Sequence, residues 1–245
     1  QNYQAGIEIH SKFTLFAEGC RGHLGKKLMS QFDLRRKAQH QTYGIGLKEL
    51  WEVKPENSKP GNVMHSIGWP LDQETYGGSF LYHLDKNLVS IGFVIGLDYK
   101  NPYLSPYEEF QRFKMHPSIK PLLDEGRRVS YGARALNEGG WQSLPKLSFP
   151  GGSLIGCDAG TLNTPKIKGT HTAMKSGIVA SECVFRKLEQ NLEGVELESF
   201  QLEFNNSWAG KELKAARNVR PSFKYGLKLG TILTGIDQIF LRGKA

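Results

Sequence analysis

Cysteine is scarce in this chain, and its few copies lie far apart. Cys20, Cys157 and Cys183 are the only three in 245 residues, and they form no Cys-x-x-Cys pair. An odd, widely spaced set argues against a disulfide framework and against a zinc or iron–sulfur site built from these residues. We therefore expect no metal ligands in this chain.

Long apolar runs are absent as well. No stretch approaches the roughly 18 consecutive apolar residues that a membrane-spanning helix needs. The first ten residues, QNYQAGIEIH, have the layout of neither a signal peptide nor an Arg-rich transit peptide. With 39% hydrophobic and 23% charged residues, the composition is that of a globular protein with one large or two small domains.

The chain is basic, but it has no nucleic-acid signature. Its formal net charge is +8, yet no cluster of basic residues is interleaved with aromatic residues. We therefore expect no nucleic-acid partner, and the charge favours an acidic partner or an anionic lipid surface. No Ser/His/Asp set or pair of carboxylates stands out, so the sequence names no catalytic residue.

The most informative stretch joins a predicted strand to a predicted helix. The apolar run at residues 153–157 predicts a buried strand of a mostly parallel sheet, and a helix is expected to begin between Thr170 and Thr172. Apolar or small residues at three- and four-residue steps predict the core face of that helix. They are Met174, Ile178, Ser181, Phe185 and Leu188.

The loop between this strand and helix is rich in glycine. Gly156, Gly160 and Gly169 would let a ligand approach the backbone, and Asp158 could accept hydrogen bonds from sugar-like hydroxyls. The helix start also offers unpaired N–H groups to a phosphate. From the residues alone, a nucleotide site and an ordinary crossover of an α/β fold both remain open.

Residues 38–150 have the pattern of an antiparallel sheet. Stretches rich in β-branched and aromatic residues, at 40–53, 62–69, 77–84, 87–99 and 127–136, alternate with short turns. One helix interrupts them. It is announced by the capping box that begins at Ser105 with Pro106 and Glu108, and His116-Pro117 ends it.

The C-terminal part is predicted to be helical. Two stretches, 197–204 and 208–218, are expected to be scaffold helices. The last segment places Leu229, Ile232, Leu233, Ile236, Ile239 and Phe240 on one helical face, with Lys and Arg residues beside it. Such a face fits a helix lying in a membrane interface, and an ordinary core-facing helix shows the same stripe.

Four stretches together resemble one enzyme family. GCDAGTLN followed by KIKGTHTAMKSG is similar to the second flavin-binding segment of electron transfer flavoprotein:ubiquinone oxidoreductases. Three other stretches agree in the same order: GWPLDQETYGGSFLYHL, GLDYKNPYLSPYEEFQRFKMHPSI and RRVSYGARALNEGGWQSLPKLSFPGG. The resemblance covers residues 44–220, far more than a single motif.

The resemblance implies an α/β (α+β) fold in which an antiparallel-sheet quinone-binding domain is inserted into a partial FAD-binding Rossmann-like domain. In this arrangement, part of the FAD-binding domain is formed by residues 1–38 and by the returning segment 151–195. The ubiquinone-binding domain is formed by residues 39–150. Residues 196–245 form a helical region with a membrane-surface helix. In the first part, an alternating stretch at Gly6 to His10 precedes a strand at Lys12 to Phe16.

The resemblance also implies which residues form the FAD site, the quinone site and the membrane surface. Those for FAD are Glu18, Gly19, Gly156, Asp158, Gly160, Gly169, Thr170 and Thr172, and those for the quinone are Gly77 and Gly78. Those for the membrane surface are Phe223, Leu229, Ile232, Leu233, Ile236 and Phe240. From the residues alone, Glu18 could equally be a solvated acid in a strand-to-helix turn. Gly77 and Gly78 could equally form a tight turn that enters a strand.

The implied activity is electron transfer from reduced electron transfer flavoprotein, through a 4Fe-4S cluster and FAD, to ubiquinone. The implied location is peripheral, on the matrix side of the mitochondrial inner membrane or on a bacterial cytoplasmic membrane. Family members also carry an N-terminal GxGxxG segment and a four-cysteine cluster domain, and this chain shows neither, so the cluster ligands lie outside it. A non-catalytic docking module and a related flavin-dependent isoprenoid reductase are the alternatives.

Overall fold

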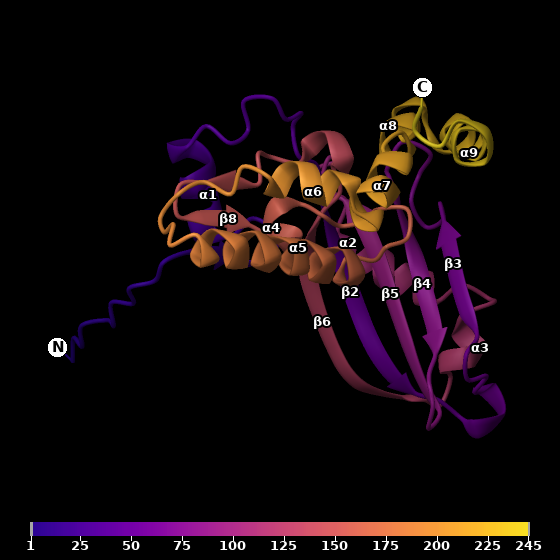
Figure 1. The fold of residues 1–245 in the computed structure, drawn as a ribbon. Helices are drawn as coiled ribbons and strands as arrows, with labels where there is room; N and C mark the ends of the chain where they lie inside the picture. Colours follow the sequence, from indigo (N-terminus) through magenta and orange to yellow (C-terminus); the bar gives the residue numbers. More distant parts are fainter. Residues whose placement is uncertain (1, 245) are drawn as a thin grey trace.

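Residues 2–244 are described by the computed structural model, and they fold around two β-sheets (Figure 1). The smaller sheet has the order β1 (Thr14–Phe16), β8 (Gly152–Leu154) and β7 (Ser148–Phe149). β1 and β8 are parallel, and β7 pairs with β8 in the antiparallel sense. The two parts predicted for FAD therefore meet in one sheet, which is mixed in direction.

The strand predicted at 153–157 is shorter than expected. β8 ends at Leu154, and a short helix, α4 (Gly156–Ala159), begins two residues later. Gly156 has a φ of +60°, a left-handed conformation that side chains other than glycine rarely adopt. This glycine turns the chain out of the sheet and ends the strand early.

The larger sheet is antiparallel throughout, as predicted, with the order β3-β4-β5-β2-β6. Its strands are β2 (Tyr43–Glu52), β3 (Val63–Ile67), β4 (Gly77–His83), β5 (Leu88–Gly96) and β6 (Arg127–Asn137). The central strand β5 is almost entirely buried. This sheet forms one half of the molecule, and the smaller sheet with its helices forms the other (Figure 1).

Helix α2 (Pro106–Lys114) packs against β5 and β2, and its cap at Ser105 is confirmed. The side chain of Ser105 accepts a hydrogen bond from the Glu108 N–H (3.4 Å). Phe110 and Phe113 are buried in a core that they share with the β5 residues Val89, Ile91, Phe93 and Ile95. The short helix α3 (Lys120–Leu123) and the 3₁₀ turn η1 (Pro55–Asn57) complete this half.

Four longer helices surround the smaller sheet. They are α1 (His23–Gln31), α5 (Thr170–Glu189), α6 (Phe200–Asn206) and α7 (Trp208–Ala215), with the 3₁₀ turn η2 (Trp141–Ser143) beside α7. The predicted start of α5 and the two predicted scaffold helices are confirmed. Their core is centred on Leu147, Leu154, Phe200 and Phe204.

The predicted core face of α5 is wrong. Met174, Ile178 and Phe185 are exposed by 64%, 46% and 61%. The buried positions are the smaller Thr172, Ser176, Val179, Ala180 and Cys183. Small side chains allow α5 to approach α4, α6 and α7 closely, so the larger apolar side chains are left on the opposite face.

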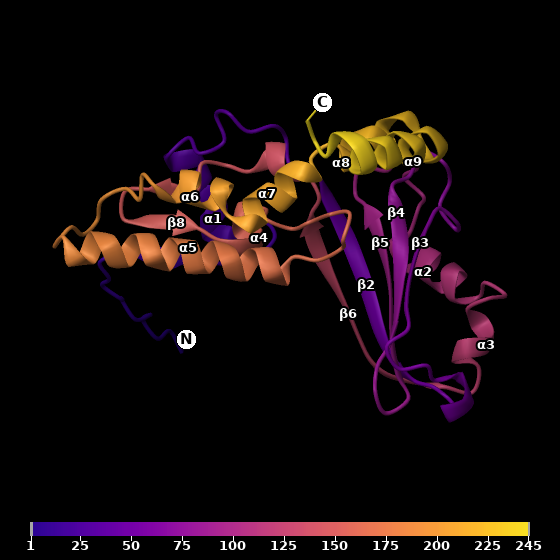
Figure 2. The ribbon, with the colours of Figure 1, turned by 45° about the vertical axis from the view of Figure 1, so that its right-hand side comes forward.

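The C-terminal segment lies above the ends of β3, β4 and β5 (Figure 2). It contains α8 (Val219–Ser222), the turn η3 (Phe223–Tyr225), α9 (Leu227–Ile236) and a π-helical turn, η4 (Asp237–Leu241). The Leu227 N–H donates to the carbonyl of Gln73 (2.9 Å), which ties α9 to the loop before β4. Within residues 2–244, no helix is both long and apolar enough to cross a membrane.

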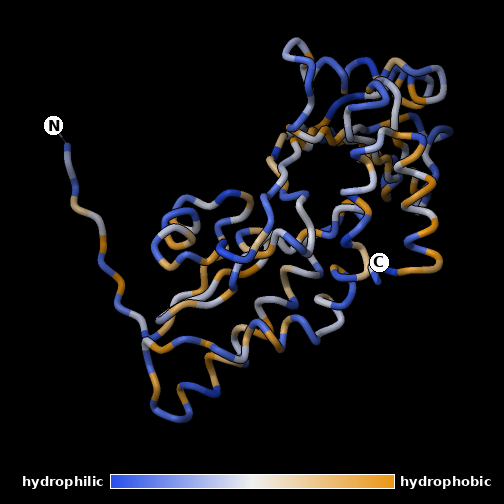
Figure 3. Tube along the Cα trace, turned by 90° about the horizontal axis from the view of Figure 1, so that it is seen from above, coloured by the Kyte–Doolittle hydropathy of each residue, from blue (hydrophilic) through white to orange (hydrophobic). Residues whose placement is uncertain are grey.

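The alternating stretch expected at Gly6 to His10 forms no strand. These residues precede β1 as an extended segment that projects from the body of the molecule (Figure 3). Ile7 and Ile9 are exposed by 93% and 85%. An extended segment without a neighbouring strand cannot pair its backbone groups, so the alternation alone does not make it part of a sheet.

Candidate functional site

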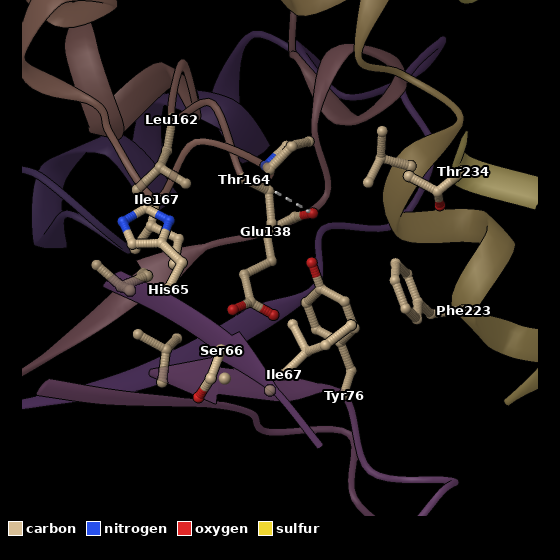
Figure 4. A pocket seen from close by; sticks show the side chains of 16 residues that line it. His65, Ser66, Ile67, Tyr76, Glu138, Leu162, Thr164, Ile167, Phe223 and Thr234 are labelled. Carbon is tan, nitrogen blue, oxygen red and sulfur yellow. Dashed lines mark hydrogen bonds between the residues drawn. The ribbon is translucent and has the colours of Figure 1, made fainter. Parts of the chain in front are cut away.

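A mostly apolar cavity of about 230 Å³ lies where three distant parts of the chain meet (Figure 4). We call it the apolar cavity. Strands β3, β4 and β5 supply one wall, the loop after α4 a second, and the C-terminal segment a third. Among the residues that line the apolar cavity are His65, Tyr76, Gly77, Gly78, Glu138, Leu162, Thr164, Ile167 and Phe223.

Gly77 and Gly78 both line the apolar cavity at the start of β4. A Cβ atom at Gly78 would lie 2.4 Å from the Ser66 carbonyl oxygen, and one at Gly77 would lie 2.6 Å from the Val94 carbonyl oxygen. Side chains at these positions would therefore push against the neighbouring strands β3 and β5. The glycine pair is needed for close strand pairing, and it also presents bare main chain to the cavity.

Glu138 was not singled out by the sequence, and it stands in the middle of the apolar cavity. Its carboxylate lies between Ser66 and Tyr76 (Figure 4). The residue is 3% exposed, and its Oε2 has no hydrogen-bond partner among residues 2–244. Burial raises the pKa of Glu138 to about 7, although the nearby Arg220 opposes this. The sequence signal was a lone acid in Asn-Glu-Gly-Gly, directly after a strand.

Arg220 connects Glu138 to the surface. Its Nη2 donates to both oxygens of Asp98 (2.8 Å each), and its Nε lies 3.7 Å from Glu138 Oε2. The guanidinium lies 4.2 Å from the centre of the Tyr76 ring, which in turn contacts Phe223 at 5.0 Å between ring centres. Burial raises the pKa of Tyr76 to about 12, so its hydroxyl stays protonated.

A second cavity, of about 570 Å³, opens beside the smaller sheet, and we call it the basic cavity. Arg21, Lys26 and Arg35 line it together with Asp158. Asp158 is 3% exposed, and neither carboxylate oxygen has a hydrogen-bond partner within residues 2–244. Burial raises its pKa to about 6. Cations for phosphates and a buried acceptor without a partner fit part of a dinucleotide such as FAD.

Several residues predicted for FAD do converge near the basic cavity. The Gly25 N–H donates to Glu18 Oε2 (2.8 Å), so Glu18 caps the first turn of α1. A Cβ atom at Gly22 would lie 2.6 Å from both Asp158 Oδ1 and Glu18 Oε2, which places the two acids side by side. Gly19, with a φ of +88°, follows Glu18 in the same turn.

The other predicted FAD residues follow a short distance along the chain. Gly160 ends α4 with a φ of +89°. Thr170 is exposed, whereas Thr172 is fully buried and its hydroxyl donates to the Gly169 carbonyl (2.9 Å). Thr172 therefore secures the start of α5, and its hydroxyl is already committed within the chain.

The loop that follows α4, residues 163–171, lines the apolar cavity and is held by Glu212 of α7. Its carboxylate accepts hydrogen bonds from Asn163 (2.7 Å) and Lys166 (2.8 Å), and His171 Nε2 lies 2.7 Å away. Partial burial alone would raise the pKa of Glu212, but the bonds from Lys166, His171 and Asn163 lower it to about 2. A carboxylate on a scaffold helix thus fixes a loop that lines the apolar cavity.

Sequence comparison shows which known proteins this chain is similar to. A family model described as "ETF-QO, ubiquinone-binding" matches residues 43–136. The chain is also 58% identical, over 98% of its length, to the mitochondrial electron transfer flavoprotein-ubiquinone oxidoreductase of Homo sapiens. Almost the whole chain is therefore similar to one part of an electron transfer flavoprotein-ubiquinone oxidoreductase. The chain spans about two fifths (40%) of the length of that relative.

Solved structures share the fold of this chain. A geranylgeranyl bacteriochlorophyll reductase-like protein from Thermoplasma acidophilum matches 96% of the chain and 55% of its own length, with a TM-score of 0.69 and 13% identity. A triple mutant of the flavin-dependent brominase Bmp2 matches 96% and 56%, with a TM-score of 0.62 and 16% identity. The expected α/β flavoprotein fold with an antiparallel sheet is confirmed. The domain boundaries remain predictions.

The next question is whether the described residues could hold a metal ion or a 4Fe-4S cluster. Among the described residues, no three His, Cys, Asp or Glu side chains are grouped so as to hold a metal ion. Cys20, Cys157 and Cys183 are free thiols. The residues present therefore do not fit a 4Fe-4S cluster.

Proposed function

We propose that this chain supplies the quinone site and part of the FAD site of an enzyme that passes electrons from reduced electron transfer flavoprotein to ubiquinone. The observation that carries the proposal is the apolar cavity, because Gly77 and Gly78 share it with the loop that follows the FAD-associated Asp158. A flat, apolar quinone ring suits a cavity of mostly apolar walls with few polar groups.

In this proposal the residues bind, orient and exclude water. Arg21, Lys26 and Arg35 hold phosphates, and Asp158 accepts hydrogen bonds from hydroxyl groups. Leu162 and Ile167 keep water from the quinone. FAD, when bound, exchanges electrons singly or in pairs. The 4Fe-4S cluster expected for the family is proposed to have its ligands outside this chain.

Helix α9 and the turn after it are proposed to contact the membrane. Leu229, Ile232, Leu233, Ile236, Ile239 and Phe240 are exposed by 39–76%. Lys224, Lys228, Arg242 and Lys244 flank them and can meet anionic lipid headgroups. Phe223, predicted for the same surface, is half-buried and lines the apolar cavity instead, next to Thr234 of α9.

This arrangement supports a route for ubiquinone from the lipid into the apolar cavity along Phe223 and α9. We propose a peripheral protein on the matrix side of the mitochondrial inner membrane or, in a bacterial cell, on the cytoplasmic membrane. The human relative carries the word mitochondrial in its name. The proposed partners are electron transfer flavoprotein, ubiquinone and the lipid surface.

The substitution Asp158→Asn tests the flavin part of the proposal. At neutral pH the wild-type fold must hold a buried carboxylate whose pKa is raised to about 6, a cost that disappears at acid pH. Without flavin, the variant should therefore be more stable at pH 7.5 by about 1–3 kcal/mol, a difference that shrinks as the pH falls from about 6 towards 3.8. Its affinity for FAD should fall about tenfold because an acceptor of hydroxyl groups is lost.

The measurements are flavin content by absorbance, FAD titration and thermal unfolding, together with reduction of a short-chain ubiquinone analogue by the wild type. Asp124→Asn is the matched control, because Asp124 is an exposed acid at the far end of the larger sheet. Wild-type FAD affinity in Asp158→Asn would contradict the flavin assignment. A flavin-loaded wild type that cannot reduce the quinone analogue would contradict the activity.

A further inference from the structure

Glu138 has an environment that folding alone does not explain. A buried carboxylate is costly unless its oxygens are hydrogen-bonded, and Glu138 Oε2 has no such partner in the described part of the chain. Replacing it with an apolar residue would remove that cost. Ionisable groups that are buried in a cavity without such hydrogen bonds are frequently functional.

The main chain holds Glu138 firmly while its side chain extends into the apolar cavity. The Glu138 N–H donates to the Thr42 carbonyl (2.7 Å), and its carbonyl accepts from Thr164 Oγ1 (3.4 Å). A Cβ atom at Gly44 would lie 2.2 Å from Glu138 Oε1, and one at Gly96 3.4 Å from Oε2. Glycines on β2 and β5 thus make the room that the carboxylate occupies.

The charged and titratable groups around Glu138 form a path from the cavity to solvent. Arg220 of α8 lies 3.7 Å from Oε2 and can stabilise the carboxylate after a proton has left. Arg220 is held by Asp98, whose side chain is 53% exposed. Tyr76 and His65 face the same cavity, and His65 Nε2 lies 2.8 Å from the Tyr82 hydroxyl.

We propose that Glu138 donates a proton to the quinone reduced in the apolar cavity, and that the Arg220–Asp98 pair marks the side from which it is reprotonated. The proposal rests on the proposed function, which supplies both electrons from the reduced flavin. Ubiquinone, two electrons and two protons give ubiquinol. The carboxyl O–H bond of Glu138 breaks as an O–H bond forms on one quinone oxygen, and water at the cavity mouth provides the second proton.

The raised pKa of Glu138, about 7, agrees with this role. At neutral pH roughly half of such carboxyl groups carry the proton, and a general acid is most effective when its pKa is near the working pH. An ordinary glutamate would hold almost no proton at that pH. The donor form would be lost as the pH rises through about 7.

The test uses Glu138→Gln in the flavin-containing protein. The flavin is reduced chemically, and its reoxidation by a short-chain ubiquinone analogue is followed by stopped flow between about pH 5.5 and 9. We expect the wild-type rate to fall above about pH 7, and the variant to be about 100-fold slower with little pH dependence. FAD content and the quinone dissociation constant should be unchanged.

Two further variants sharpen the comparison. Glu138→Asp keeps a carboxyl group and should recover part of the rate together with a pH dependence. Glu109→Gln removes a carboxylate that is paired with Arg112 on α2, outside both cavities, and should match the wild type. Infrared difference spectra, wild type minus Glu138→Gln, of the flavin-loaded proteins without quinone should show a protonated carboxyl at pH 6 that weakens by pH 9. Subtraction removes the contribution of Asp158, which is also partly protonated at pH 6.

The proposal is overturned if Glu138→Gln reoxidises within twofold of wild type with the same pH profile. It is also overturned if the variant only binds quinone more weakly and reaches the wild-type maximal rate. If Glu138→Gln loses its flavin, the reoxidation rate of Glu138→Asp becomes the test. A wild-type rate and pH profile in Glu138→Asp would then refute proton donation. A wild type that transfers no electrons to the quinone would instead refute the proposed function itself.

Discussion

The loop at residues 163–171, which lines the apolar cavity, should depend on one carboxylate, and Glu212→Gln tests this dependence. In the wild type, Glu212 accepts hydrogen bonds from Asn163 and Lys166, and His171 lies within hydrogen-bond distance. Glutamine has nearly the same shape but no charge, and its amide NH₂ cannot accept from these donors. We expect the loop at residues 163–171 to loosen and the fold to lose stability.

The magnitude follows from the pKa of Glu212. A decrease from 4.5 to about 2 is equivalent to about 3 kcal/mol of stability at neutral pH. The Glu212 side chain is 23% exposed, so solvent screening reduces the expected loss to about 1–2 kcal/mol. For a chain of this size, that loss lowers the unfolding temperature by roughly 3–6 °C.

The lowered pKa of Glu212 also determines how its contribution to the stability of the fold changes with pH. A carboxyl with a lowered pKa stabilises the fold above its unfolded value near 4.5, and this stabilisation is lost as the pH falls towards 2. The difference in unfolding temperature between wild type and Glu212→Gln should therefore narrow from pH 6 to pH 3. Both proteins are compared by calorimetry at a series of pH values.

The matched control is Glu198→Gln. Glu198 is 76% exposed and lies 3.2 Å from Lys187, a surface pair that should contribute less than about 1 kcal/mol. Equal destabilisation by the two substitutions, or a Glu212→Gln protein that unfolds at the wild-type temperature, would refute the argument. A difference that stays constant with pH would show that the charge of Glu212 is not the cause.

Two further predictions concern the membrane face and the glycine pair. Ile232→Glu combined with Phe240→Glu should weaken binding to anionic vesicles at least about tenfold in a flotation assay, whereas Leu202→Glu, at a 63% exposed position on α6, should not. Gly78→Ala should lower the free energy of unfolding by about 1–3 kcal/mol, because its Cβ would lie 2.4 Å from the Ser66 carbonyl oxygen. A Gly78→Ala protein with unchanged stability but weaker quinone binding would show that this glycine serves only the cavity.

The larger sheet was predictable because its signals are local. Alternating side chains and turn residues marked the five strands within a few residues of their observed ends. The start of α2 follows directly from the Ser105 and Glu108 capping pair. Strands joined by short turns leave few alternatives to antiparallel pairing, so the direction of the strands was predictable, whereas their order was not predicted.

The face of α5 could not be predicted, for a physical reason. A stripe of apolar residues shows that one side of a helix avoids water, but not which element will cover that side. In α5 the larger stripe, with Met174 and Phe185, is exposed, while Ser176 and Ala180 make the close contacts. Packing density, which periodicity does not report, decided the orientation.

The candidate site was predictable only in its separate pieces. Glycines at 77–78 announced a close approach of main chain and do line the apolar cavity, whereas Gly156 and Gly160 only flank Asp158, which lines the basic cavity. Their meeting depends on how β4, the loop after α4 and Phe223 come together, which is a property of the tertiary fold. Glu138 had no periodic or spacing signal, because its importance arises from being buried there with no hydrogen bond to Oε2 within residues 2–244. Residues whose chemistry is created by burial can be found only once the surroundings that bury them are known.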